Sequence, residues 1–247
     1  MSRCWRLAAL AAPLLLLSAA PALAQSLTLD LGGEGGTSTG RIVQLVALLT
    51  VLSLAPAILV TVTSFTRIVV VLSFLRNALG MQQTPPNIVL ISLALFLTGF
   101  VMAPTLQKSY DDGIAPLIAE KLPEDEALTR AAAPLHDFMT AHVRSQDLQL
   151  FAGMAKLDSI ADPKAVPYRV LVPAFMISEL RRAFEIGFLL FLPFLVIDLV
   201  ISSILMSMGM MMLPPVTISL PFKLIFFVLV DGWYLVAGSL VQSFGTG

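Results

Sequence analysis

Four long apolar segments, separated by polar stretches, set the pattern of the chain and predict membrane-associated helices. They cover residues 42–63, 88–103, 183–205 and 216–244. Crossing a bilayer takes about 20 mostly apolar residues, so the segments are close to or above the necessary length. Prolines interrupt three of them, where we expect kinks or breaks, namely Pro56, Pro193 and Pro221. The pattern therefore predicts an all-α fold of kinked apolar helices.

The polar stretches between these segments predict a topology. Residues 64–87, read as a loop, carry Arg67 and Arg76 without any acidic residue, which places them on the cytoplasmic side by the positive-inside rule. Residues 105–182 change character, with nine basic and eleven acidic side chains. We predict that they form a soluble helical insert on the outer, periplasmic side.

The N-terminal residues are typical of a secretory signal peptide. Two arginines precede an apolar run over residues 7–20, and Ala22 and Ala24 supply the small residues of a cleavage site. The alternative is an uncleaved membrane helix, which the short run and its flanking prolines disfavour. The predicted organisation is a signal peptide (1–24), a flexible leader (25–40), a first apolar hairpin (41–104), the insert (105–182) and a second apolar hairpin (183–247).

A methionine cluster joins the last two apolar segments. Five of the seven residues from 206 to 212 are methionine, with Gly209 among them. Methionine is unbranched and polarizable, so such a surface can re-pack around changing shapes. A greasy turn between helices is the simpler interpretation, but the density of methionine favours a deformable contact or seal.

A short motif in this turn occurs twice in the chain. Gly80-Met81, three residues and Pro85-Pro86 recur as Gly209-Met210, three residues and Pro214-Pro215. Both copies lead into an apolar segment, so the chain can be read as two related hairpins separated by the insert, as in transporter repeats. Chance is the alternative, because glycine and proline are common in turns.

Four ionisable residues lie in apolar surroundings, namely Glu185, Asp198, Lys223 and Asp231. A charge at the centre of a bilayer costs about 3 kcal/mol on insertion scales, so these side chains are expected to face protein or water. Lys223 and Asp231, eight residues apart, are predicted on one side of the same helix. We favour contacts between helices or subunits over an ion or proton relay.

Composition and motifs exclude several classes of function. The chain is 57% hydrophobic and 13% charged, against about 25% charged in soluble domains. Its net charge of −1 offers no footprint for nucleic acid. The single cysteine, Cys4, lies in the predicted signal peptide. His136 and His142 are read as surface histidines without metal-ligand spacing. Asp198 and Asp231 lack the Gly-x-Gly-Asp setting of a membrane aspartyl protease, so we predict no catalytic residues, no metal, no cofactor and no enzyme.

Three blocks of sequence resemble the FliP family, the flagellar members of the type III export-gate group. They are residues 173–188, PAFMISELRRAFEIGF, which include Glu179; the block from Asp198 to Lys223 followed by LVDGW; and residues 74–87, FLRNALGMQQTPPN. The resemblance covers essentially the mature chain. The signal peptide and the long insert favour the flagellar family over its virulence-system counterpart.

The resemblance implies a subunit of the flagellar protein export gate. FliP-like proteins assemble with their own copies and with FliQ and FliR in the inner membrane at the flagellar basal body, and unfolded substrates pass through with the help of FlhA and FlhB. A methionine loop acts as the gasket of the pore, here Met208, Met210, Met211 and Met212. The resemblance also implies that the apolar helices can lie above the bilayer plane, buried against neighbouring subunits.

A function of a different class, an ion-coupled secondary transporter, stays open at this point. The repeated hairpin, the interrupted helices and the embedded Asp198, Lys223 and Asp231 support it. A transporter requires a polar, substrate-sized site within one chain, whereas a gate requires an apolar methionine constriction that forms only between chains. A membrane protease ranks third.

Overall fold

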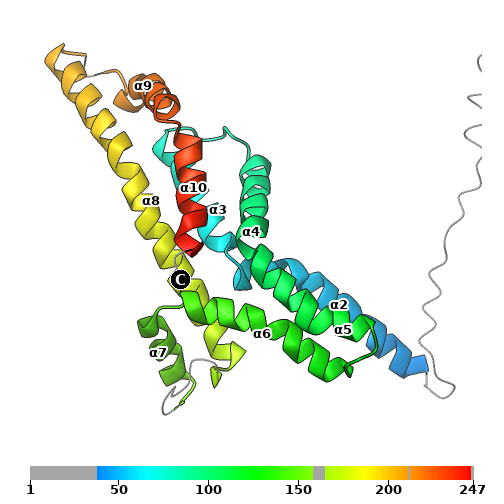
Figure 1. The fold of residues 1–247 in the computed structure, drawn as a ribbon. Coiled ribbons are helices and arrows are strands. Elements are labelled where there is room, and N and C mark those ends of the chain that lie inside the picture. Colours follow the sequence, from blue (N-terminus) through cyan, green and yellow to red (C-terminus); the bar gives the residue numbers. More distant parts are fainter. Residues whose placement is uncertain (1–37, 158–164, 211, 246–247) are drawn as a thin grey trace, which may run out of the picture. The chain divides into compact units, whose positions relative to one another are not determined.

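The computed structural model describes residues 38–157, 165–210 and 212–245 (Figure 1). The predicted signal peptide with Ala22 and Ala24, Cys4 and Met211 therefore lie outside the described residues. Two units are distinguished, Met1–Leu52 and Ser53–Gly247. In the first unit the structure describes the beginning of helix α2; the rest of the fold belongs to the second.

All elements in the described part of the chain are helical, as predicted. In order they are α2 (Ser38–Val62), α3 (Phe65–Ala78), α4 (Asn87–Ser109), the π-helix η1 (Tyr110–Ile114), α5 (Ala115–Ile118), α6 (Glu124–His142), α7 (Ser145–Met154), α8 (Tyr168–Ser207), α9 (Pro215–Leu229) and α10 (Gly232–Gly245). Helix α3 lies among α4, α8 and α10 (Figure 1).

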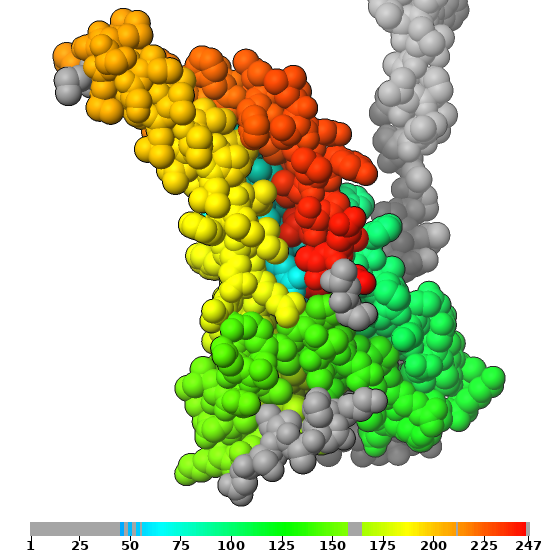
Figure 2. All heavy atoms as spheres, turned by 60° about the vertical axis from the view of Figure 1, so that its left-hand side comes forward, coloured from blue at the N-terminus to red at the C-terminus, as the bar shows by residue number. Residues whose placement is uncertain are grey.

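Helix α3 is the centre of the main core, although its residues were read as a loop. The expectation of a loop is wrong, while the cytoplasmic side stays a prediction. Apolar side chains recur along α3 at helical spacing and are buried, namely Ile68, Val71, Leu72 and Leu75. Two arginines lower the mean hydropathy of this segment, but its apolar residues keep the spacing of a helix. Figure 2 shows α3 (cyan) almost covered by α8 (yellow) and α10 (red).

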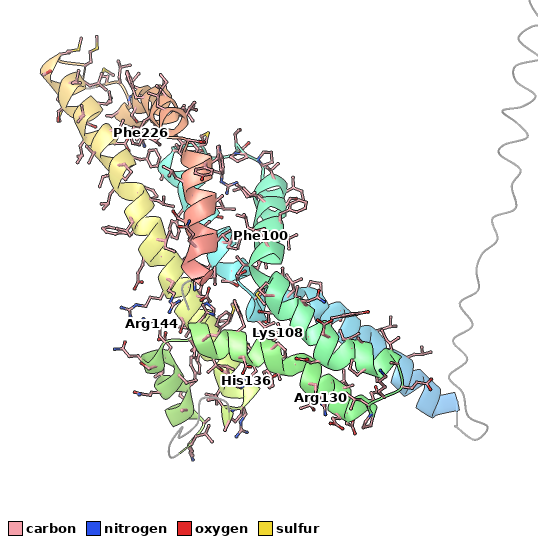
Figure 3. All side chains as sticks on the ribbon, viewed as in Figure 1. Phe100, Lys108, Arg130, His136, Arg144 and Phe226 are labelled. Carbon is pink, nitrogen blue, oxygen red and sulfur yellow. The ribbon has the colours of Figure 1, made fainter. Side chains whose placement is uncertain are left out.

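The insert builds a second, smaller core against the start of α8. Met139 of α6, Val170, Leu171 and Phe175 belong to it. The insert is also fixed by Ser178 of α8, whose hydroxyl donates to Asp147 Oδ2 at 2.7 Å. Because α8 begins at Tyr168, one helix crosses the boundary predicted at residue 182. Figure 3 shows Arg130, His136 and Arg144 on the insert, and Phe100 and Phe226 on the apolar helices α4 and α9.

The expectation of a surface position for His136 is wrong. Its side chain is buried, and its Nε2 lies 2.8 Å from the carbonyl oxygen of Val166. The ring of Tyr168 packs edge-on against the imidazole, with centroids 5.1 Å apart. The imidazole thus joins α6 to the segment that leads into α8. Among the described residues no group of His, Cys, Asp and Glu side chains could hold a metal ion.

Two helical stretches in the described part of the chain are long and apolar enough to cross a membrane, residues 87–118 and α8. Two bent pairs would add one span each: Pro56–Val62 with α3, bent by 82°, and α9 with α10, bent by 64°. The helices continue through Pro56, Pro193 and Pro221, so a break at these prolines is not seen. The sharp bends lie elsewhere, between the members of each bent pair.

The close approach of α3 and α8 generates a prediction about Gly187. A methyl group at this position would lie 2.6 Å from Cδ2 of Phe74, within overlap distance. We expect Gly187→Ala to lower the free energy of unfolding by about 1–3 kcal/mol, since an overpacked helix interface must shift. Gly99→Ala, at a helical position with open space, is the control and should be neutral or stabilising. Chemical denaturation in detergent measures both, and equal stability of the two variants would contradict this packing.

Candidate functional site

Among the described residues, the ion pair that is buried at both partners joins α3 to α8. Arg67 and Glu179 are only 1% and 0% exposed. The Arg67 Nε donates to Glu179 Oε2 at 2.8 Å, and Nη2 donates to Oε1 at 2.5 Å. This is the two-pronged geometry in which guanidinium and carboxylate match best. Glu179 was singled out from the sequence, whereas Arg67 was not.

The remaining donors of Arg67 reach α10. Nη1 donates to the hydroxyl of Ser243 at 2.9 Å and to its carbonyl oxygen at 3.3 Å. The guanidinium carbon lies 3.6 Å from the centroid of the Phe244 ring, in position for a cation–π contact. One side chain therefore holds three helices together. The signal that could have revealed it is a lone arginine on an otherwise apolar helical face.

A second ion pair lies at the other end of α3. Lys223 of α9 is 3% exposed, and its Nζ donates to Asp198 Oδ2 of α8 at 2.7 Å. The same Nζ donates to the carbonyl oxygen of Ala78 at 3.2 Å, and Ser219 donates to Asp198 Oδ1 at 2.5 Å. Ala78 is the last residue of α3, where unpaired carbonyl groups and the helix dipole favour a cation.

The other two embedded charges lie outside these clusters. Glu185 pairs with Arg181 of the same helix at 3.0 Å, and both side chains are more than half exposed. Asp231 is exposed and has a positive φ of 50° at the turn between α9 and α10. Because α9 ends at Leu229, the prediction that Lys223 and Asp231 share one side of a single helix is wrong.

The methionine loop connects α8 to α9 and is exposed in the single chain. Met208, Met210 and Met212 are 63%, 45% and 98% exposed. Gly209 has a positive φ of 74°, and the N–H groups of Gly209 and Met210 donate to the carbonyls of Met206 and Leu205. This pattern is a helix C-terminus closed by a left-handed glycine.

The second copy of the motif, at residues 80–86, forms the same kind of turn at the end of α3. Gly80 has a φ of 77°, and the N–H groups of Gly80 and Met81 donate to the carbonyls of Asn77 and Arg76. Pro85 and Pro86 align with Pro214 and Pro215, but α4 begins after Pro86 whereas α9 begins at Pro215, so the next helix starts one motif position later in the first copy. The sequence echo thus corresponds to a shared conformation at the helix ends before each turn.

These features define a class: an all-helical, membrane-associated protein whose described residues present an apolar surface and hold one buried and one partly buried ion pair between helices. A model of the FliP family matches residues 48–240. A flagellar biosynthetic protein FliP from Caulobacter vibrioides is 62% identical over 228 residues, which cover 92% of this chain and 86% of the relative. A protein of the same name from Bacillus subtilis is 57% identical over 202 residues, covering 82% and 91%. The chain belongs to the FliP family, and the resemblance inferred from the sequence is confirmed.

The buried pair at the centre of the fold generates the next prediction. Arg67→Met leaves Glu179 buried without its partner, so we expect the free energy of unfolding to fall by about 3–5 kcal/mol. Replacing both residues, Arg67→Met with Glu179→Leu, should restore most of it, because no isolated charge remains. Arg181→Met is the matched control, since its exposed pair contributes at most about 1 kcal/mol. Denaturation in detergent measures all three, and a mild effect of Arg67→Met alone would contradict the interpretation.

Proposed function

We propose that this chain is a core subunit of the flagellar type III protein export gate. In this proposal it forms, with its own copies and with FliQ-like and FliR-like subunits, the pore through which unfolded flagellar proteins pass. Membership of the FliP family supports the flagellar assignment. The observation that carries the gate is the methionine loop, which the fold presents outward at the junction of α8 and α9.

The methionine loop has the properties of a seal formed between chains. Met208, Met210 and Met212 are exposed, so their apolar surfaces require a partner outside this chain. Their unbranched side chains can close around substrates of different shape. The loop is held at both ends, by the left-handed turn at Gly209 and by the Pro214-Pro215 start of α9. Flexible side chains on a fixed backbone suit a gasket.

The surface of the apolar helices supports burial between subunits. Phe184 and Phe188 of α8 are 58% and 64% exposed, and the charged pair Arg181–Glu185 lies on the same stretch of the helix. Lipid would cover the aromatic rings but would leave the charges poorly solvated. A neighbouring protein surface satisfies both. This combination favours protein contacts over a fully lipid-facing helix.

The location follows from the same proposal. We place the protein in the bacterial inner membrane at the flagellar basal body, with the signal peptide removed and the insert on the periplasmic side. FlhA-like and FlhB-like export components and membrane lipid would complete its surroundings. The charged side chains of the insert and the apolar surfaces of α4 and α8 support a membrane-associated body with one polar end (Figure 3).

The surroundings of Asp198 favour the gate over the transporter alternative. Asp198 is neutralised by Lys223 and accepts a further hydrogen bond from Ser219, so its two oxygens are both engaged. A cavity of about 270 Å³ among α3, α8, α9 and α10 is lined only by apolar side chains and Gly232, whereas a more polar cavity of about 760 Å³ lies beside the insert, away from Asp198 and Lys223. A transporter needs polar ligands for its substrate in such a place.

Purification of the tagged chain in mild detergent, followed by mass measurement, tests the assignment. A large complex with several copies of this chain and two small apolar partners is the expected result. A monomer or simple dimer without partners would contradict the proposed gate.

The seal generates a prediction that can be measured in cells and in vesicles. In Met210→Ala with Met212→Ala, shorter side chains leave the constriction open, so we expect small ions to leak and growth to slow. Met154→Ala is a matched control, because Met154 is a 69% exposed methionine in the insert. Unchanged ion conductance in the double variant, with normal amounts of assembled complex, would rule out the gasket.

A further inference from the structure

We infer that the C-terminal end of α3, in the first hairpin, positions the methionine loop of the second hairpin through Lys223. This inference rests on the proposed gate function. The end of the helix that precedes the first motif copy then supports the helix that follows the second copy. Lys223 is a positioning residue, and the C-terminus of α3 is its fixed support.

The first step concerns how the loop is closed. Asp198 lies on α8 before the methionine loop, and Ser219 and Lys223 lie on α9 after it. Both α9 side chains bond to the carboxylate of Asp198, at 2.5 Å and 2.7 Å. These bonds join the two helices on either side of the loop, and they restrict the distance that the loop must span.

The second step concerns what this helix pair is held against. Lys223 Nζ also donates to the carbonyl oxygen of Ala78, at the end of α3. A Cβ atom added at Gly80 would lie 4.0 Å from Cγ1 of Val216, so a larger side chain at this position would reach the first turn of α9. Val216, Ser219 and Lys223 are spaced at i, i+3 and i+7 and therefore share one face of α9. That face lies against α3 and α8.

The third step concerns which contacts determine the position of α9. Apolar packing permits helices to slide, whereas the bonds from Lys223 to a carboxylate and to a carbonyl hold only at one register of α9 against α3 and α8. The methionines provide no such restriction, because those described in the loop are exposed in the single chain. The place of the loop therefore depends on the contacts of α9, one of which, from Lys223 to Ala78, lies at the end of α3.

Substitution of Lys223 tests this coupling in the assembled complex. Lys223→Met keeps a long apolar side chain but removes the donor to Ala78 and Asp198, while the methionine loop stays intact. We expect ion leak per assembled complex to rise severalfold. Lys223→Arg retains charge and donors, and is expected to show a smaller leak than Lys223→Met. Normalising to assembled complex separates a displaced seal from a loss of protein.

Substitution of Gly80 tests the same coupling from the other hairpin. Its φ of 77° is poorly tolerated by a β-branched residue and better tolerated by asparagine. No atom other than Val216 Cγ1 lies within 4 Å of an added Cβ, so space is available and the backbone conformation decides the outcome. We expect Gly80→Val to leak like Lys223→Met, and Gly80→Asn to retain a tighter seal. Gly99→Val, in the open middle of α4, is the control for a mere change of side chain.

The outcomes separate the two levels of the proposal. Should Lys223→Met fail to assemble, Asp198→Asn with Lys223→Met removes the isolated charge and still lacks the donor to Ala78. Normal conductance in Gly80→Val and in this double variant, beside a leak in Met210→Ala with Met212→Ala, overturns the positioning role and leaves the gasket standing. Absence of leak in the methionine variant instead overturns the gasket itself.

Discussion

Arg67 reaches across the interior of this protein to Glu179, and its guanidinium lies at the same time over Phe244 and against Ser243. A buried pair of this kind contributes little net stability compared with apolar side chains of similar volume, because both ions lose their hydration. Its effect is on specificity, since any other packing of α3, α8 and α10 would leave a charge unpaired. Apolar helices can pack in many ways, and this interaction selects one of them.

A single copy of the chain has a small interior for its length. The core around α3 uses one face of each neighbouring helix, while large apolar side chains such as Phe96, Phe100 and Val228 remain more than 70% exposed. Much of the apolar surface must therefore be covered from outside. The ion pairs Arg67–Glu179 and Lys223–Asp198 lie near opposite ends of α3 and join it to its neighbouring helices within the single chain.

Prediction from sequence succeeded where the signal is local. The helical class follows from the apolar segments, and the repeated Gly-Met motif coincides with two helix ends that the structure closes with a positive φ at Gly80 and Gly209. The errors arise from contacts between distant residues. Arg67 and Glu179 are 112 positions apart. Arg67 made its segment look like a polar loop, whereas its distant partner allows it to lie in the helical core. His136 is buried for the same reason, by Val166 and Tyr168. Hydropathy ranks residues by type and contains no information about such partners.

Helix α8 runs without interruption from Tyr168, beside the core of the insert, to Ser207, one residue before Met208. Forty residues of α-helix extend about 60 Å. The insert and the methionine loop therefore lie at the two ends of one continuous helix. A tilt of about 5° at the insert would move the other end by roughly 5 Å, comparable to a side chain's length. A displacement of the insert is thus linked to the methionine loop directly, by the backbone of α8.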